Sequence, residues 1–180
     1  MLDMPDVEEN GAARSGVQRK VEMDWRSPRE GMCRCGQVRI RVAAPPLVTA
    51  ACHCTGCQKM SSSAFSLTAT IPSQAFEVTA GAPVVGGLRG ETSHMFCGDC
   101  MSWMFTRVAS FDFFVNVRST TLDAPEDFPP FIESFTSEKL PFAQTGAVHA
   151  YEQFPAVEAY ESLMAEYREW PHGWRAPEKQ

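Results

Sequence analysis

The chain has 180 residues, of which 44% are hydrophobic and 11% aromatic, and this composition predicts one domain with a sizeable core. Its formal net charge is -6, and no stretch gathers basic residues into the stripe that a nucleic-acid backbone requires, so DNA and RNA are disfavoured as partners. The polar, acidic N-terminus lacks the apolar run of a signal peptide, and no segment reaches membrane-spanning length, which predicts a soluble cytoplasmic protein without a membrane partner.

Residues 1–28 are predicted to form a flexible N-terminal leader, and a single domain is predicted over 29–170. Within that domain, polar and apolar residues alternate with period two in Gln37–Val42 and in Ala64–Thr70, as half-buried strands require. Four further short runs rich in aromatic and β-branched residues also predict strands: 76–79, 92–96, 102–108 and 113–117. Short strands separated by Gly, Pro and Asp turns predict a mainly β, antiparallel folded-sheet or sandwich domain.

One helix is predicted, near the C-terminus, over residues 154–169. Its apolar side chains recur at helical spacing, namely Phe154, Val157, Tyr160, Leu163, Met164 and Tyr167. Pro155 suits a first helical turn and Pro171 ends the helix. We expect the helix to cap the sheet, and residues 171–180 to form a tail.

Seven cysteines dominate the interpretation of function. A chain without a secretory signal stays where thiols are reduced, and an odd number of cysteines would leave one thiol unpaired, so a disulfide framework is disfavoured. Structural zinc takes four ligands, often as two short pairs, whereas catalytic zinc keeps three protein ligands and an open position. Metal binding is therefore the favoured role for the clustered thiols, which are Cys33, Cys35, Cys52, Cys54, Cys57, Cys97 and Cys100.

The spacing of the cysteines favours a division into four and three. Cys52, Cys54 and Cys57 fall within the tight loop C-H-C-T-G-C, where Gly56 is expected to permit the backbone reversal, so these three can converge on one ion. The two remaining pairs, 33/35 and 97/100, would then clip distant parts of the domain together around a second ion. An alternative division, in which the 97/100 pair joins two of the middle three, stays open.

The three-cysteine set is interpreted as an open zinc site, with a closed structural site as the alternative. In the closed case the fourth ligand would be His53 or a distant side chain. Because neighbouring side chains of an extended segment point to opposite faces, we expect His53 to face away from the ion. Seven thiolates also call for nearby cations, which would balance them or hold a substrate carboxylate, unless they are ordinary solvated residues; the candidates are Arg34, Arg39, Arg41, Lys59 and Arg107.

The motifs together resemble a known family. G-x-C-x-C-G-x-V-R begins at Gly31, C-H-C-x-x-C-Q-K begins at Cys52 with S-A-F after it, and F-C-x-x-C begins at Phe96. With T-L-D at Thr121, this order over most of 29–153 resembles the glutathione-dependent formaldehyde-activating family, which includes the centromere protein V domain. The resemblance implies a mainly β, Mss4-like fold with two zinc ions; the four cysteines of the outer pairs would be structural ligands and the middle three labile or catalytic ligands.

The resemblance also implies an activity, the condensation of glutathione with formaldehyde to S-hydroxymethylglutathione, which is a carbon-sulfur lyase reaction read in reverse. The expected partners are a small thiol and an aldehyde, with Lys59 steering an acidic substrate and a homo-oligomer left open. The chain departs from the family pattern at Met101, at Glu133 in place of a histidine and at Ser137–Phe142, so a small thiol other than glutathione stays open. The alternative function is a non-catalytic, zinc-stabilised or redox-responsive binding module.

Overall fold

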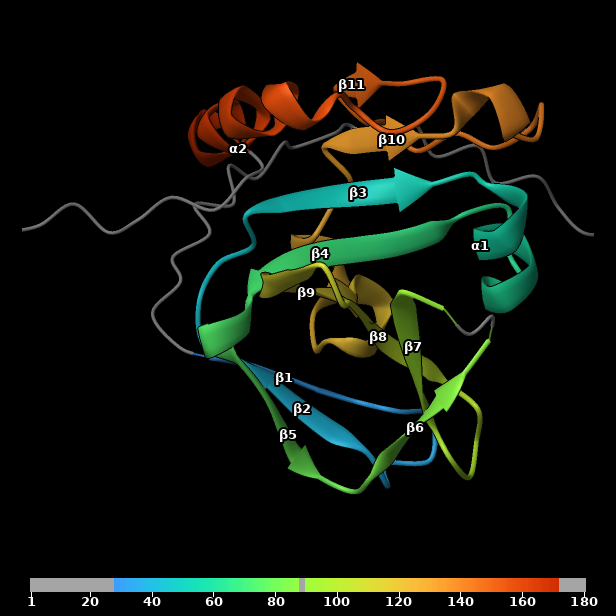
Figure 1. Cartoon of the computed structure of the whole chain (residues 1–180), viewed down its shortest axis with the longest axis vertical. Helices are drawn as coiled ribbons and strands as arrows, with labels where there is room; N and C mark the ends of the chain where they lie inside the picture. Colours follow the sequence, from blue (N-terminus) through green and yellow to red (C-terminus); the bar gives the residue numbers. More distant parts are fainter. Residues whose placement is uncertain (1–27, 88–89, 172–180) are drawn as a thin grey trace, which may run out of the picture.

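The structure of the chain is a computed structural model that describes residues 28–87 and 90–171. The leader predicted over 1–28 and the tail predicted over 171–180 lie outside these residues, apart from Pro28 and Pro171. The described residues form a three-stranded sheet, in the order β1-β2-β5, and an eight-stranded sheet, in the order β11-β10-β3-β4-β9-β8-β7-β6 (Figure 1).

The described residues form eleven strands and two α-helices. The six predicted strands are all present, with their ends displaced by at most two residues. In chain order the elements are β1 Arg29–Met32, β2 Arg39–Val42, β3 Val48–Cys52, α1 Thr55–Ser61, β4 Ser66–Pro72, β5 Phe76–Ala80, β6 Pro83–Gly86, β7 Thr92–Cys97, β8 Trp103–Val108, β9 Phe111–Arg118, β10 Ile132–Ser134, β11 His149–Ala150 and α2 Tyr160–Glu169.

The mainly β, folded-sheet prediction is confirmed, with one refinement: the larger sheet is mixed. β10 pairs in parallel with both β3 and β11, whereas the remaining pairs in this sheet are antiparallel. The parallel pairing sets Ser134 beside Cys52, with the backbone N–H of His53 donating to the carbonyl of Ser134 at 2.9 Å. A distant segment is thereby fixed against the end of β3, where three of the cysteines begin.

The main core lies between the two sheets and follows the period-two pattern of the strands. Ile40 and Val42 from β2 meet Ile71 from β4 and Val115 and Val117 from β9, and all five are fully buried. Burying each such side chain contributes roughly 1.5–3 kcal/mol. The opposite face of β4 and β9 therefore carries the polar alternate residues, and this face holds the site described below.

The C-terminal helix is present but begins later than predicted. A short 3₁₀ turn over Val157–Ala159 precedes α2, so Phe154 and Pro155 lie before the helix. Phe154 instead stacks edge-on against Phe135 at 4.8 Å between ring centroids. Leu163 and Tyr167 form the buried stripe of α2 and, in a second core cluster, pack with Val48, Phe131 and Ile132. The helix therefore caps the end of the larger sheet, as expected.

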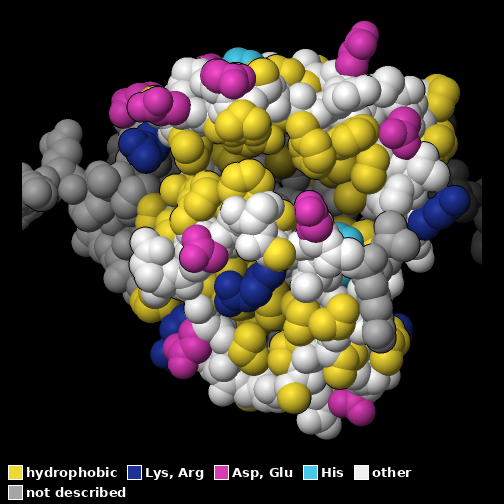
Figure 2. Space-filling view, in the orientation of Figure 1, with side chains coloured by type: hydrophobic (Ala, Val, Ile, Leu, Met, Phe, Trp, Pro, Cys, Tyr) yellow, Lys and Arg dark blue, Asp and Glu magenta, His cyan; other side chains and the backbone are white. Residues whose placement is uncertain are grey.

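The second helix, α1, replaces the tight loop that was predicted around the middle cysteines. Gly56 lies in the first turn of α1 and is not among the glycines with positive φ, so a helix start reverses the chain there. No described helix is long and apolar enough to cross a membrane. In Figure 2, hydrophobic side chains cover much of the face between the layer of α2, β10 and β11 and the strands below it.

Candidate functional site

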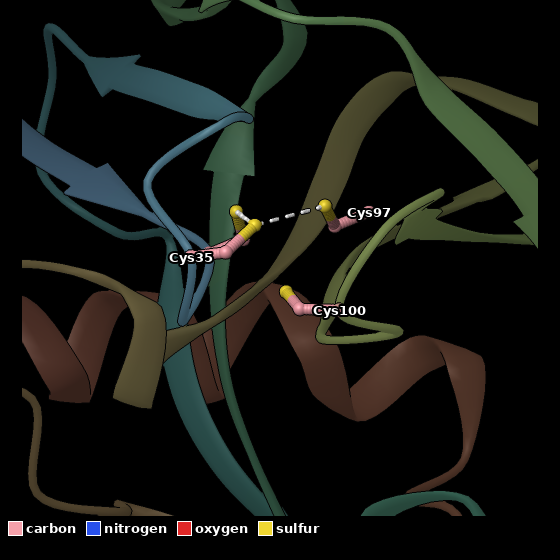
Figure 3. A group of neighbouring side chains, drawn as sticks. Cys35, Cys97 and Cys100 are labelled. Carbon is pink, nitrogen blue, oxygen red and sulfur yellow. Dashed lines mark hydrogen bonds between the residues drawn. The ribbon is translucent and has the colours of Figure 1, made fainter.

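Four cysteines meet where the β1–β2 turn approaches the β7–β8 turn. The sulfur atoms of Cys33, Cys35, Cys97 and Cys100 all lie within 4.8 Å of one another, and Figure 3 shows Cys97 and Cys100 facing Cys35. The Cys33 and Cys35 sulfurs are 3.4 Å apart, and those of Cys35 and Cys97 are 3.7 Å apart. Sulfurs in a tetrahedral zinc-thiolate site lie about 3.8 Å apart, given Zn–S bonds of about 2.3 Å. This cluster has the size and the donors for a closed metal site.

The two turns that present these sulfurs share a backbone feature. In the first turn, the N–H of Cys33 donates to the carbonyl of Val38, and in the second the N–H of Cys97 donates to the carbonyl of Ser102. The residue after the second cysteine is left-handed in both turns, with φ of 77° at Gly36 and 57° at Met101. A glycine accepts this conformation freely, whereas methionine accepts it at a steric cost. Met101 therefore occupies a position whose backbone favours glycine.

The other three cysteines gather where β3 runs into α1. Cys52 ends β3, Cys54 is the N-cap of α1 and Cys57 lies within that helix, and their sulfurs also lie within 4.8 Å of one another. The backbone N–H of Cys57 donates to the Cys54 sulfur at 3.3 Å. Among the described residues, no fourth Cys, His, Asp or Glu ligand atom joins this group. The cysteines thus group in space as four and three, the division that the spacing favoured.

The thiols of this cluster differ in pKa. Hydrogen bonding with Cys57 lowers the pKa of Cys52 to about 5, in spite of its burial, and the Ser134 side chain assists. Donating to Cys52 and being buried both raise the pKa of Cys57 well above its ordinary value, while the Ser66 hydroxyl acts in the opposite direction. Cys52 is therefore the sulfur that carries negative charge first, and two serine hydroxyls lie beside the cluster.

His53 points away from the sulfur atoms, in agreement with the alternation argument. Its side chain is fully buried, and its Nε2 lies 3.1 Å from Oε2 of Glu133. Its Nδ1 has no hydrogen-bond partner among the described residues. Glu133 also accepts two hydrogen bonds from Lys139 Nζ, at 2.7 and 2.9 Å, and one from Thr145 at 2.9 Å.

Glu133 is thus the centre of a buried hydrogen-bonding network. Burial alone would raise its pKa, but the hydrogen bonds from Lys139, Thr145 and His53 outweigh burial and lower the pKa. Because His53 joins Cys52 to Cys54 in the chain, the network holds the backbone of the three-cysteine loop. The charge that Glu133 brings is offset by the ammonium group of Lys139.

A buried arginine, Arg118, lies on the polar face of β9. Its side chain is 7% exposed, its guanidinium stacks on the Trp103 ring at 4.1 Å, and its Nη1 donates to Ser66 Oγ at 3.2 Å. Burial lowers its pKa to about 10, and the sulfurs of Cys57 and Cys52 oppose that shift. The group therefore remains a cation at neutral pH, close to the three-cysteine cluster.

Arg118 also forms part of the wall of a solvent-open cleft of about 600 Å³. One side of the cleft is the end of α1 and the start of β4, from Met60 to Leu67, and the other side includes Cys100 to Trp103. Arg34 and Arg118 are its charged lining residues, and no acidic side chain of the described chain lines it. The cleft is lined by Cys100 of the four-cysteine cluster and by Ser66, which lies opposite Cys52 in the β3–β4 register, and it carries positive charge in a protein of net charge -6.

The other predicted cations are placed differently. Arg41 pairs with Glu30 at 2.7 Å, and Arg107 lies over the rings of Phe76 and Phe105. Lys59 is exposed in the last turn of α1 and is not among the residues that line the cleft. Of the cations that the sequence suggested, Arg34 alone therefore lines the cleft.

Sequence reasoning missed Arg118, Ser66 and Ser134. Arg118 ends a strand whose alternation predicts only that it shares a face with Asn116, and nothing local indicates that this face meets the cysteines. The register supplies the missing information, because Ser66 lies opposite Cys52 and Arg118 lies opposite Thr68, two residues further along β4. These contacts join segments that are far apart in the sequence.

Comparison with known proteins finds one family model that matches residues 28–138, described as glutathione-dependent formaldehyde-activating enzyme. No curated protein matches the chain. Among solved structures, the chain is similar to a crystal structure of a Rhodobacter sphaeroides protein, with 22% sequence identity and a TM-score of 0.45. That match covers 53% of this chain and 88% of the other.

Proposed function

The chain belongs to the glutathione-dependent formaldehyde-activating enzyme family, and from this premise we propose that it is a zinc-dependent carbon-sulfur lyase or synthase. In the direction of synthesis it would join a small, glutathione-like thiol to an aldehyde such as formaldehyde. The observation that carries the proposal is the three-cysteine cluster, in which no fourth ligand is present among the described residues. An ion held there keeps a position free for a substrate thiol.

The donors of both clusters suit zinc. Thiolates are ligands that zinc prefers, and the sulfur spacing of the four-cysteine cluster matches a tetrahedral site. We assign a structural ion to Cys33, Cys35, Cys97 and Cys100, and a catalytic ion to Cys52, Cys54 and Cys57. When bound to the latter three, zinc supplies a Lewis acid that favours the thiolate form of an incoming thiol.

The surrounding residues prepare this site for a negatively charged sulfur. Three thiolates outweigh the charge of one divalent ion, and Arg118 provides a buried positive charge beside Cys57 and Cys52. Ser66 and Ser134 provide hydroxyl groups next to Cys57 and Cys52. In the reaction, a bond forms between the thiol sulfur and the carbonyl carbon, the carbonyl π bond breaks, and the thiol proton ends on the new hydroxyl oxygen. Exposed Lys59 would steer an acidic substrate towards this side of the molecule.

The alternative, a binding module without turnover, requires a second zinc ion that is closed by protein atoms. His53 was the nearest candidate for a closing ligand. Its Nε2 is directed to Glu133, and its ring nitrogens are not part of the ligand group. The geometry therefore favours the open site and the enzyme.

X-ray absorption combined with metal analysis tests the proposal. Two zinc ions that share seven cysteine sulfurs give an average of about 3.5 sulfur ligands per zinc, and a bound substrate thiol raises the average to about 4. We expect this increase on addition of glutathione, together with formation of a ¹³C-hydroxymethyl adduct from ¹³C-formaldehyde above the uncatalysed rate. Unchanged spectra and an uncatalysed rate would together rule out the enzyme.

The matched variant is Cys52→Ser, which should lose one zinc ion and the catalysed rate while keeping the fold. Ser110→Ala, in the exposed turn between β8 and β9, serves as the control and should behave as wild type. Loss of both zinc ions from Cys52→Ser would count against two independent sites.

A further inference from the structure

Gln58 follows the last of the three clustered cysteines, and the proposed reaction leaves its side chain without a role. The amide of this side chain folds back over the first turn of α1. Its Nε2 donates to two backbone carbonyls, that of His53 at 2.6 Å and that of Glu138 at 3.0 Å. A glutamine amide has two N–H donors, so both are used. Gln58 therefore joins the cysteine loop to a segment 80 residues further along the chain.

Glu138 binds the same turn of α1 through its side chain. Its Oε2 accepts a hydrogen bond from the Thr55 hydroxyl group and another from the Thr55 backbone N–H at 2.6 Å. These two hydrogen bonds lower the pKa of Glu138, so its carboxylate is charged at neutral pH. Glu138 ends a 3₁₀ turn that follows β10, and Figure 1 shows this part of the chain beside α1. We call the hydrogen bonds that join Gln58, Thr55 and Glu138 the α1 clamp.

The α1 clamp completes the hydrogen bonding of the His53 backbone, which lies between two of the cysteines. The His53 N–H donates to the carbonyl of Ser134 at 2.9 Å, and the His53 carbonyl accepts from Gln58. Because both polar groups of this residue are bonded, the peptide units on either side of it have fixed orientations. Those orientations set the directions of the Cys52 and Cys54 side chains. None of these bonds involves a cysteine sulfur, so they can hold the loop in shape before a metal ion binds.

The helix that carries Cys57 has little else to hold it in place. α1 has seven residues, and none of them is fully buried. A helix this short is marginal by itself, and most helices are stabilised by packing of an apolar face. With no fully buried residue, α1 depends strongly on polar contacts for its position. The α1 clamp supplies such contacts at both ends of the first turn.

We propose that Gln58 and Glu138 are positioning residues of the three-cysteine site, which hold α1 and the His53 peptide so that three sulfurs converge on one metal ion. This inference rests on the ion that the proposed function assigns to these cysteines, but not on the reaction. Among the described residues, neither side chain forms a hydrogen bond with a member of the four-cysteine cluster. The four-cysteine site therefore serves as a reference within the same molecule.

Zinc titration of the full chain against a chelating indicator measures the affinities of both sites. ¹¹³Cd NMR assigns them, because cadmium bound by three thiolates and cadmium bound by four give separate resonances. Gln58→Met keeps the length of the side chain but removes its N–H donors. Because outer-shell hydrogen bonds support metal affinity by about 10- to 100-fold, this variant should weaken the three-cysteine site by that factor and leave the four-cysteine site unchanged.

Three further variants serve as control and comparison. Gln74→Met makes the same substitution at an exposed glutamine in the 3₁₀ turn before β5, and both affinities should stay at wild-type values. Glu138→Gln keeps an oxygen that accepts from Thr55, so it should weaken the three-cysteine site less than Glu138→Ala does. The comparison of these two variants tests the α1 clamp even if Gln58→Met does not fold.

The outcomes separate positioning from general stability and from catalysis. Equal losses of affinity at both sites in Gln58→Met, or no loss at either site, would overturn the proposal. Excess zinc should restore the wild-type rate of adduct formation to Gln58→Met, because the variant lacks only the bound ion. A variant that holds two zinc ions and stays slow would overturn the positioning role. If wild type forms no adduct, the proposed reaction fails, whereas selective loss of the three-cysteine site in Gln58→Met still supports the α1 clamp.

Discussion

The two cysteine clusters use the same ligand chemistry in opposite settings. The four-cysteine cluster joins the β1–β2 turn to the β7–β8 turn, and the buried sulfurs of Cys33 and Cys97 belong to the main core. The three-cysteine cluster joins nothing distant by itself, since its ligands fall within six residues at the end of β3 and the start of α1. Instead, distant polar residues are brought to it, namely Ser66, Arg118 and Ser134.

This difference indicates how one chain separates stability from reactivity. A closed set of four ligands stabilises the contact between two hairpins and leaves no position for a substrate. An open set of three ligands depends on other residues for its shape. Here the hydrogen bonds of Glu133 with His53 and Lys139 hold the backbone between Cys52 and Cys54. Under the proposed assignment, ligand number decides which cluster stabilises the fold and which cluster takes part in the reaction.

The largest expected effect comes from removing one ligand from each cluster in turn. Cys97→Ser should lose one zinc ion and several kcal/mol of the free energy of unfolding, because a structural zinc ion contributes on the order of 10 kcal/mol in small domains. Cys54→Ser should also lose one zinc ion but little stability, because serine is a preferred N-cap and keeps α1 in place. Metal analysis and urea unfolding measure both. Equal destabilisation by the two variants would abolish the distinction between the clusters.

An intermediate effect is expected from the network behind the three-cysteine loop. Glu133→Gln should reduce the free energy of unfolding at pH 7 by about 1–3 kcal/mol, the range for hydrogen bonds to charged groups. The lowered pKa of Glu133 means that this contribution is present above the unfolded-state pKa and is lost as pH falls through the folded-state pKa. The difference between wild type and variant should therefore shrink below about pH 4.5.

Urea unfolding of both proteins at several pH values measures that difference. Glu166→Gln is the control, since Glu166 pairs with His149 at the surface, where an ion pair contributes about 0–1 kcal/mol. A difference that stays constant down to pH 3 would show that the charge of Glu133 does not matter to the network.

The smallest effect concerns the four-cysteine cluster and should be a gain. Met101→Gly should raise the free energy of unfolding by about 0.5–1 kcal/mol, since a left-handed backbone costs an L-residue about 1–2 kcal/mol and part of the gain is lost to the freer unfolded chain. Thermal unfolding measures it. The control, Met32→Gly, changes an exposed methionine of β1 outside the left-handed region and should destabilise the protein. If both variants destabilise equally, strain at Met101 is absent.

The sequence predicts six strands, two from period-two alternation and four from runs rich in aromatic and β-branched residues. Phe76–Ala80 and Thr92–Cys97 are found within one residue of their predicted ends. β3 was missed because four of its five residues, Val48 to Ala51, show no such alternation, with both faces largely covered by neighbouring elements. β10 was missed because three residues are too short for a periodic signal, and its parallel partners are far away in the sequence.

Some features of the site can be predicted from residues close together in the sequence, whereas others depend on contacts between residues far apart in the sequence. The grouping of the cysteines follows from spacing alone, since ligands that are close in sequence can converge on one ion. The positions of the buried charged residues do not follow from spacing, because Glu133 lies 80 residues from His53 and Arg118 lies 52 residues from Ser66. The tertiary fold decides which charged side chains are buried. The sequence around Glu133 and around Arg118 does not indicate that these two side chains are buried.

The turn from Cys97 to Ser102 belongs to two sites at once. Cys100 is a member of the four-cysteine cluster, and Cys100, Met101 and Ser102 also line the cleft beside Arg118. If a molecule in the cleft binds more tightly when this turn holds its metal, the bound metal and the bound molecule favour each other by the same factor. Occupation of the cleft would then slow the loss of that ion to a chelator.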